Sequence, residues 1–168
     1  MDDPRVLVLG IGNTLMQDDG VGVWAVEALS EDYDAPGHVK IMDGGVAGLR
    51  LLGEIAWAEF LLIVDAVKGG GAPGSIYRLG PENLPARQGP FFSAHEVGIA
   101  ELLSALEFTG KLPKTRIIGV EPLETETVGL EPTEPLRAAL PGVVAAVVAE
   151  LDGMGVVLRR RRDLSGRR

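Results

Sequence analysis

An aliphatic strand that runs into a glycine-rich, acidic turn is the feature that most constrains this chain. Val6–Leu9 is followed by Gly10-Ile11-Gly12-Asn13 and then by Asp18-Asp19-Gly20-Val21-Gly22. Glycine allows close approach of the backbone, so this order predicts a strand, a tight turn and a helix. The same order is typical of dinucleotide sites, but their fingerprint needs a third glycine or alanine where this chain has Leu15. The segment therefore predicts acidic side chains at the carboxyl end of a first strand.

Aliphatic runs and helical stripes predict alternating strands and helices. Residues 6–9 and 61–64 are near-continuous aliphatic runs, typical of parallel strands that helices cover on both faces. Further strands are expected at 39–42, 75–79 and 116–120, and helices through 21–29, 49–52, 99–106 and 136–151. We expect Pro141-Gly142 to kink or restart the last helix, and Gly153 and Gly155 to end it.

The length of 168 residues and the 46% hydrophobic content suit one compact domain. We place a single α/β domain at residues 1–157 and a basic, disordered C-terminal tail at residues 158–168. The glycine-rich segment 68–74 and the proline-rich segment 80–92 are expected to be surface loops. Long irregular loops of this kind are where we expect a partner to be discriminated.

The charge distribution argues against a nucleic acid partner. The net charge is −8, and the tail holds 6 of the 16 basic residues with one of the 24 acidic ones. The body therefore carries 10 basic and 23 acidic residues, a net charge of −13. The N-terminus is acidic, and its apolar run is shorter than a signal-peptide core or a membrane span. We expect a cytoplasmic protein with no membrane partner.

The chain has no cysteine, which excludes disulfides, thiolate ligands and a cysteine nucleophile of its own. Any sulfur ligand at its site would have to come from a partner. Neither a Gly-x-Ser-x-Gly elbow nor a His-Glu-x-x-His helix occurs, so the serine-hydrolase and usual zinc-helix schemes have no support.

Three polar residues are expected at the carboxyl edge of the sheet, where open α/β sheets bind ligands. Asp19 follows the first strand, and Asp65 follows the aliphatic run 61–64. His95 lies between Ser93 and Glu96, which fit a capping box, so we expect it in the first turn of a helix. A helix N-terminus disfavours the imidazolium, so the ring stays able to bind metal. Two carboxylates and an imidazole suit a divalent ion such as nickel or zinc.

Each of these residues also has an ordinary structural interpretation. Asp18 or Asp19 would cap the first helix, Asp65 would brace a loop, and His95 would be exposed in a first turn. The combination favours a site, because the chain has only two histidines. The other, His38, precedes the second strand in a polar turn and is interpreted as a surface residue.

Several motifs in order resemble those of the nickel-iron hydrogenase maturation endopeptidases. They cover nearly the whole chain apart from the tail. The motifs are Leu9-Gly10-Ile11-Gly12-Asn13 with Asp18-Asp19-Gly20-Val21-Gly22, Asp43-Gly44-Gly45-Val46-Ala47-Gly48, Ile63-Val64-Asp65-Ala66, Ser93-Ala94-His95-Glu96-Val97-Gly98, Ala105 to Gly110, Ile118-Gly119-Val120-Glu121-Pro122 and Gly129-Leu130.

The resemblance implies a three-layer αβα sandwich around a twisted, mostly parallel five-stranded sheet. It implies a metal-dependent endopeptidase that removes the C-terminal extension of the nickel-iron hydrogenase large-subunit precursor after nickel insertion. The catalytic and metal-contacting residues then fall on Asp19, Asp65 and His95. Nickel would be carried by thiolates of the substrate rather than bound permanently. The resemblance also gives a substrate-positioning role to Asp43, Gly44 and Gly45.

Two other functions remain open from the sequence. A non-catalytic nickel-binding maturation chaperone would use the same three ligands. A nucleotide-binding module would be built on Gly10 and Gly12, with Asp43 as the acid that closes the second strand. The acids between Gly12 and Gly20 count against the second function, because a pyrophosphate needs a helix N-terminus without negative charge.

Overall fold

The computed structural model describes residues 3–46, 48–83 and 96–161. Its main sheet has five strands, β1 (Val6–Ile11), β3 (Val39–Gly45), β4 (Phe60–Ala66), β5 (Ile76–Leu79) and β6 (Lys114–Val120). Their order is β3-β1-β4-β6-β5, and all pairs are parallel except β5 with β6. All five predicted strands are present, and the predicted mostly parallel sheet is confirmed.

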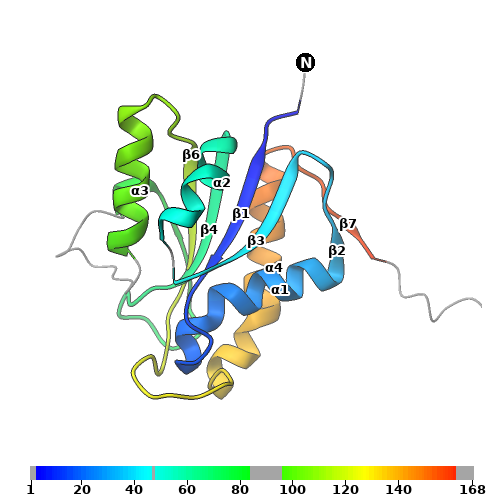
Figure 1. Cartoon of the computed structure of the whole chain (residues 1–168). Helices are drawn as coiled ribbons and strands as arrows, with labels where there is room; N and C mark the ends of the chain where they lie inside the picture. Colours follow the sequence, from blue (N-terminus) through cyan, green and yellow to red (C-terminus); the bar gives the residue numbers. More distant parts are fainter. Residues whose placement is uncertain (1–2, 47, 84–95, 162–168) are drawn as a thin grey trace, which may run out of the picture.

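Helices cover both faces of this sheet, which gives three layers (Figure 1). The longer helices are α1 (Val21–Asp32), α2 (Leu52–Trp57), α3 (Glu96–Phe108) and α4 (Glu134–Gly153), and the short 3-10 helices are η1 (Gln17–Gly20), η2 (Leu49–Leu51) and η3 (Pro81–Asn83). Alternate residues of β1 face opposite sides, as a strand requires. Val6 and Val8 pack in one core with α1 and α4, while Leu7 and Leu9 pack in a second core with α2 and α3. The predicted αβα sandwich is confirmed.

Helix α4 differs from its prediction at Pro141. The helix runs without interruption from Glu134 to Gly153, so the restart expected at Pro141-Gly142 does not occur. A proline inside a helix costs about 3 kcal/mol. Burial offsets that cost, because Leu136 before the proline and Val143 after it are both fully enclosed in the core. The predicted end at Gly153 is confirmed.

The boundary predicted for the C-terminal tail is wrong for residues 158–161. Leu158 is buried, and β7 (Arg159–Arg160) pairs antiparallel with β2 (Tyr33–Asp34). Asp34 forms ion pairs with Arg159 at 3.1 Å and Arg161 at 3.0 Å. The burial of Leu158 and the ion pairs with Asp34 therefore fix the start of the arginine-rich segment. Its sequence alone had suggested a solvated end. Residues 162–168 lie outside the described part of the chain.

Within the described part of the chain, no helix is long and apolar enough to cross a membrane.

The connections diverge between β1 and β4, and we call the region just outside the carboxyl ends of these two strands the crevice. The chain leaves β1 through α1 toward β3 on one side, and it leaves β4 toward β5 on the other side. This reversal is a topological switch point, and ligands of open α/β sheets bind outside the carboxyl ends of the strands at such points. The carboxyl ends of β1 and β4 are therefore where a site is expected.

Two glycines let α1 pack closely on this point. A Cβ atom at Gly22 would lie 2.1 Å from the Val64 carbonyl oxygen and 2.3 Å from that of Ile11. A Cβ atom at Gly10 would lie 2.3 Å from the Gly22 carbonyl oxygen. The first turn of α1 thus rests directly on the ends of β1 and β4, and no side chain fits between them.

We expect the Gly22→Ala variant to lose stability, because the added methyl group would overlap two backbone oxygens that belong to central strands. The expected loss is about 3 kcal/mol or more, above the usual range for overpacking, since backbone cannot move aside as a side chain can. Urea unfolding followed by circular dichroism measures it. Gly53→Ala is the control: it lies in α2 with no atom within 4 Å of its added Cβ, and it should be neutral or slightly stabilising. Equal stability of the two variants would contradict the packing described.

Candidate functional site

Two predicted site residues lie at the switch point, both more than nine-tenths buried. Asp65 is the second-last residue of β4 and is 5% exposed, and Asp19 lies in η1 and is 7% exposed. Helix η1 contacts β4 directly. The residues are 46 positions apart in sequence, yet the sheet topology brings both to one edge. The structure thus places these two residues at one edge of the sheet, and their role as ligands stays a prediction.

The turn between β1 and η1 fixes Asp19. The Asn13 backbone N–H donates to Asp19 Oδ2 at 3.1 Å, and the Asp19 N–H donates to the Met16 carbonyl at 3.2 Å. Gly12 adopts φ +150°, and a Cβ atom there would lie 2.0 Å from the Asp19 carbonyl oxygen. Glycine is needed at this position for both its conformation and its close contact.

Asp18, its neighbour, has a structural role. It is completely buried, and Oδ2 accepts hydrogen bonds from Leu123 N at 2.9 Å, Glu124 N at 3.1 Å and Thr133 Oγ1 at 2.7 Å. Its Oδ1 accepts a fourth from Thr133 N at 2.7 Å. The carboxylate therefore fastens the loop 121–133 to η1. Because both oxygens of Asp18 are used in this way, Asp19 is the better candidate of the two for contact with a ligand.

The third predicted ligand, His95, lies outside the described residues, as does Ser93 of its predicted capping box. The described part of α3 begins at Glu96, immediately after it. Within residues 3–46, 48–83 and 96–161, no group of three acidic, histidine or cysteine side chains could hold a metal ion. The three-residue ligand set therefore remains a prediction. His38 lies at the opposite edge, in the turn before β3, with Nδ1 3.8 Å from Asp3 Oδ2.

The Asp43-Gly44-Gly45 segment ends β3 beside the same crevice. Asp43 Oδ1 accepts the Gly45 N–H at 2.7 Å, and Arg50 donates to the Gly44 carbonyl at 2.8 Å. The Gly45 carbonyl accepts the Gly12 N–H at 2.7 Å, which ties this turn to the one that fixes Asp19. The segment lies beside the end of β1, and its role in positioning substrate remains a prediction.

A fourth buried acid at this edge was not singled out as a site residue by sequence reasoning. Glu121 follows β6 directly and is 8% exposed. Its Oε2 accepts the Gly69 N–H at 2.6 Å and the Tyr77 hydroxyl at 2.7 Å, and the Tyr77 oxygen accepts the Gly71 N–H at 2.9 Å. This network fastens the glycine-rich loop 68–74. The signal was present in the sequence, because Glu121 follows an aliphatic strand as Asp65 does.

The hydrogen bonds of these loops also affect acid–base behaviour. Burial raises the pKa of the Tyr77 hydroxyl, and its hydrogen bond to Glu121 raises it further. The backbone N–H groups of Glu126 and Thr127 donate to the Glu124 carboxylate and lower the pKa of that group. The raised pKa keeps the Tyr77 hydroxyl protonated near neutral pH, and the lowered pKa keeps the Glu124 carboxylate ionised there.

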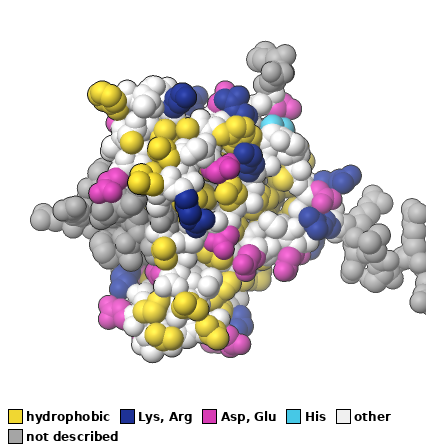
Figure 2. Space-filling view, viewed as in Figure 1, with side chains coloured by type: hydrophobic (Ala, Val, Ile, Leu, Met, Phe, Trp, Pro, Cys, Tyr) yellow, Lys and Arg dark blue, Asp and Glu magenta, His cyan; other side chains and the backbone are white. Residues whose placement is uncertain are grey.

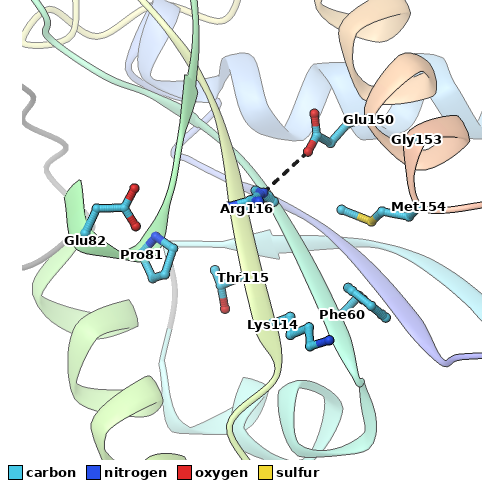
Figure 3. A pocket seen from close by; sticks show the side chains of 9 residues that line it. All are labelled: Phe60, Pro81, Glu82, Lys114, Thr115, Arg116, Glu150, Gly153 and Met154. Carbon is cyan, nitrogen blue, oxygen red and sulfur yellow. Dashed lines mark ion pairs between the residues drawn. The ribbon is translucent and has the colours of Figure 1, made fainter.

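A separate pocket of about 500 Å³ opens at the opposite, amino edge of the sheet (Figure 3). Phe60 at the start of β4 and Lys114 at the start of β6 line it. Arg116 and Glu150 face each other across it with a separation of 3.7 Å. Asp65 is five residues along β4 from Phe60, or about 16 Å at the usual rise of a strand. This pocket is therefore distinct from the crevice that holds Asp19 and Asp65.

The known proteins that this chain resembles belong to one family. The HycI family model, described as hydrogenase maturation protease, matches residues 23–150. The hydrogenase 2 maturation protease of Escherichia coli (strain K12) is 43% identical over 155 residues, which are 90% of this chain and 93% of that protein. The hydrogenase expression/formation protein HupD of Rhizobium leguminosarum bv. viciae is 38% identical over 162 residues, 95% and 80% of the two chains.

Solved structures agree with the sequence relatives. The hydrogenase maturating endopeptidase HybD from E. coli has a TM-score of 0.85 and 40% identity, over 94% of this chain and 98% of that one. The [NiFe] hydrogenase maturation protease HybD from Thermococcus kodakarensis has a TM-score of 0.70 and 26% identity, over 85% and 96%. Fold and relatives define an α/β endopeptidase. The chain belongs to the hydrogenase maturation protease family, which confirms the predicted resemblance and enzyme class.

We expect Asp18→Asn to destabilise the protein without removing any contact of Asp19. The amide keeps one acceptor oxygen and turns N–H groups toward the backbone donors of the loop 121–133. A loss of about 1–3 kcal/mol follows from the unsatisfied buried groups, to be measured by urea unfolding. Asp152→Asn, at an exposed position near the end of α4, is the matched control and should change little. Unchanged unfolding of Asp18→Asn would contradict the fastening role.

Tyr77→Phe should remove about 1 kcal/mol of stability and alter its alkaline pH dependence. The unfolded chain loses the phenolic proton near pH 10, whereas the folded protein, with its raised pKa, keeps it to higher pH. Stability therefore falls as pH rises from about 10 toward the folded-state pKa, and that part of the decline should be absent in Tyr77→Phe. Thermal unfolding between about pH 8 and 11 tests this, with Tyr33→Phe as the control for loss of a tyrosine. Identical alkaline slopes for Tyr77→Phe and the unmodified protein would contradict it.

Proposed function

We propose that this endopeptidase removes the C-terminal extension of the nickel-iron hydrogenase large-subunit precursor after nickel insertion. The observation that carries the proposal is the pair of buried carboxylates, Asp19 and Asp65, at the switch point of a hydrogenase maturation protease fold. His95 completes the proposed ligand set. Nickel is part of the substrate in this reaction, because the precursor brings it to the site.

Recognition rests on the chemistry of the donors. The precursor holds nickel through its own thiolates, and this chain has no cysteine that could compete for the ion. Carboxylate oxygens and an imidazole nitrogen are suitable ligands for positions that the thiolates leave open. A precursor without nickel offers nothing for these groups to bind, so it is a poor substrate. The protease thereby cuts only after the metal is in place.

Cleavage requires a polarised scissile carbonyl and an activated water molecule. The recognised ion, or one of the two carboxylates next to it, supplies this activation. Burial at the switch point places both groups where water screens charge weakly, which strengthens their effect on a substrate. Asp43, Gly44 and Gly45 line the same edge, which supports a role for them in holding the extension.

A non-catalytic nickel-binding chaperone would use the same three residues. The endopeptidase relatives favour cleavage. The nucleotide-binding module is not favoured, because the Asn13 N–H in the glycine turn already donates to the Asp19 carboxylate rather than facing an open phosphate site. Intact-mass measurement separates the first two functions, since only a protease shortens the precursor.

The test uses purified precursor in nickel-loaded and nickel-free forms, mixed with the unmodified protein and with Asp19→Asn, Asp65→Asn and His95→Ala. We expect the unmodified protein to shorten only the nickel-loaded precursor. Each variant should process it at least about 100-fold more slowly, as expected when a group that stabilises charge in the transition state is lost. Gel mobility and intact mass report the cleavage.

Asp152→Asn serves as the control, because it removes an exposed carboxylate at the far end of α4. Circular dichroism of every variant separates lost activity from lost folding. Processing by both Asp65→Asn and His95→Ala at the unmodified rate would refute the site. A precursor that is bound by the unmodified protein but keeps its mass would establish the chaperone instead.

A further inference from the structure

Exposed apolar side chains gather beside the crevice. Leu15 is 56% exposed, Val128 76% and Leu130 73%, and we call these three residues the apolar platform. Figure 2 shows hydrophobic side chains clustered at the end of the molecule where the loop 121–133 lies in Figure 1. Contiguous exposed apolar surface beside a site is a common mark of an interaction surface.

Backbone pairing brings the platform together from two distant segments. Met16 and Gly129 form a parallel β-bridge, with Gly129 N donating to the Leu15 carbonyl at 2.9 Å and Gln17 N donating to the Gly129 carbonyl at 3.0 Å. Residues next to the two bridge partners lie side by side in such a pair. In this parallel register Leu15 lies beside Val128, and Leu130 lies one step further along, beside Gln17.

The platform is held rigidly. Asp18 accepts four hydrogen bonds from the loop, and its own N–H donates to the Glu124 carbonyl at 3.1 Å. Gln17 has φ +50°, an unusual conformation for a residue other than glycine, and its bond to Gly129 helps to hold it there. A loop that is already ordered in the free protein loses little conformational entropy on binding.

Charge around the platform indicates what would cover it. Glu126, Glu131 and Glu134 are exposed at its border, and Arg137 offsets part of their charge by pairing with Glu131 at 3.2 Å and Glu134 at 3.4 Å. The border is net acidic, as is the chain as a whole. The complementary surface is apolar at its centre with lysine or arginine around it.

The location connects the platform to the site. Leu15 lies four residues before Asp19 in the same turn, and Asp18, which holds the loop, is the direct neighbour of Asp19. A protein seated on the platform would therefore reach over the carboxyl ends of β1 and β4. Other exposed apolar residues, such as Phe108 at the end of α3 and Val157 before β7, lie at the opposite edge of the sheet.

We propose that Leu15, Val128 and Leu130 form a docking surface for the folded body of the large-subunit precursor, through an apolar patch bordered by basic residues. This inference rests on the proposed function, and it adds a second point of contact away from the nickel. The platform holds the body of the precursor, while the crevice receives the metal and the extension. Selectivity for the nickel-loaded precursor then depends on two contacts, one of the platform with the body of the precursor and one of the crevice with its nickel.

The experiment compares two double variants that each add two negative charges at exposed apolar positions. Val128→Glu with Leu130→Glu alters the platform, and Phe108→Glu with Val157→Glu is the matched control elsewhere. Biolayer interferometry measures binding of nickel-loaded precursor, and gel mobility measures its processing. We expect the platform variant to weaken binding at least about 10-fold and to raise KM, with KM carrying most of the loss of kcat/KM. Higher salt should weaken binding to the unmodified protein.

The outcomes separate this inference from the proposed function. In one outcome, the unmodified protein binds the precursor without cleaving it while the platform variant fails to bind. This result supports docking and refutes protease activity on this precursor. Cleavage by the unmodified protein with equal binding of both double variants refutes docking alone. A platform variant that changes only self-association, measured by light scattering, also refutes it, because the surface would then bind a second copy of this chain. No binding by the unmodified protein refutes both.

Discussion

The contact between the first turn of α1 and the carboxyl ends of β1 and β4 is the constraint on which the site depends. Gly22 fills a space bounded by the Ile11 and Val64 carbonyl oxygens, and any larger residue would lift the helix off the sheet. Helix η1 leads directly into α1, so its position follows from this contact. The distance between Asp19 and Asp65 is therefore set by backbone packing rather than by the side chains themselves.

Neighbouring residues of η1 have separate roles because of helical geometry. A 3-10 helix has three residues per turn, so successive side chains point about 120° apart. Asp18 points to the loop 121–133 and accepts four hydrogen bonds from it. Asp19 points to a different side, where it accepts the Asn13 N–H at the crevice. One short turn thus fixes both the candidate site and the loop beside it.

Local patterns made the sheet and the edge acids predictable. Aliphatic runs identified β1 and β4, and the position of Asp65 after such a run placed it at the carboxyl edge. The sequence could not distinguish Asp18 from Asp19, because the partners of Asp18 lie more than a hundred residues further along the chain. For the same reason β7 was missed: its pairing partner Asp34 is distant, while its arginines suggest a solvated end.

Four buried acids of the described residues lie at the carboxyl edge of the sheet, and hydrogen bonds give two of them a structural role. Asp18 and Glu121 each accept backbone N–H groups from a loop that they hold, so their charge is compensated within the fold. Their burial therefore has a structural reason. Asp19 and Asp65 are likewise buried and lie where the strand connections diverge. Two carboxylates thus hold loops, while Asp19 and Asp65 lie at the switch point, where we propose that the nickel of the substrate is bound.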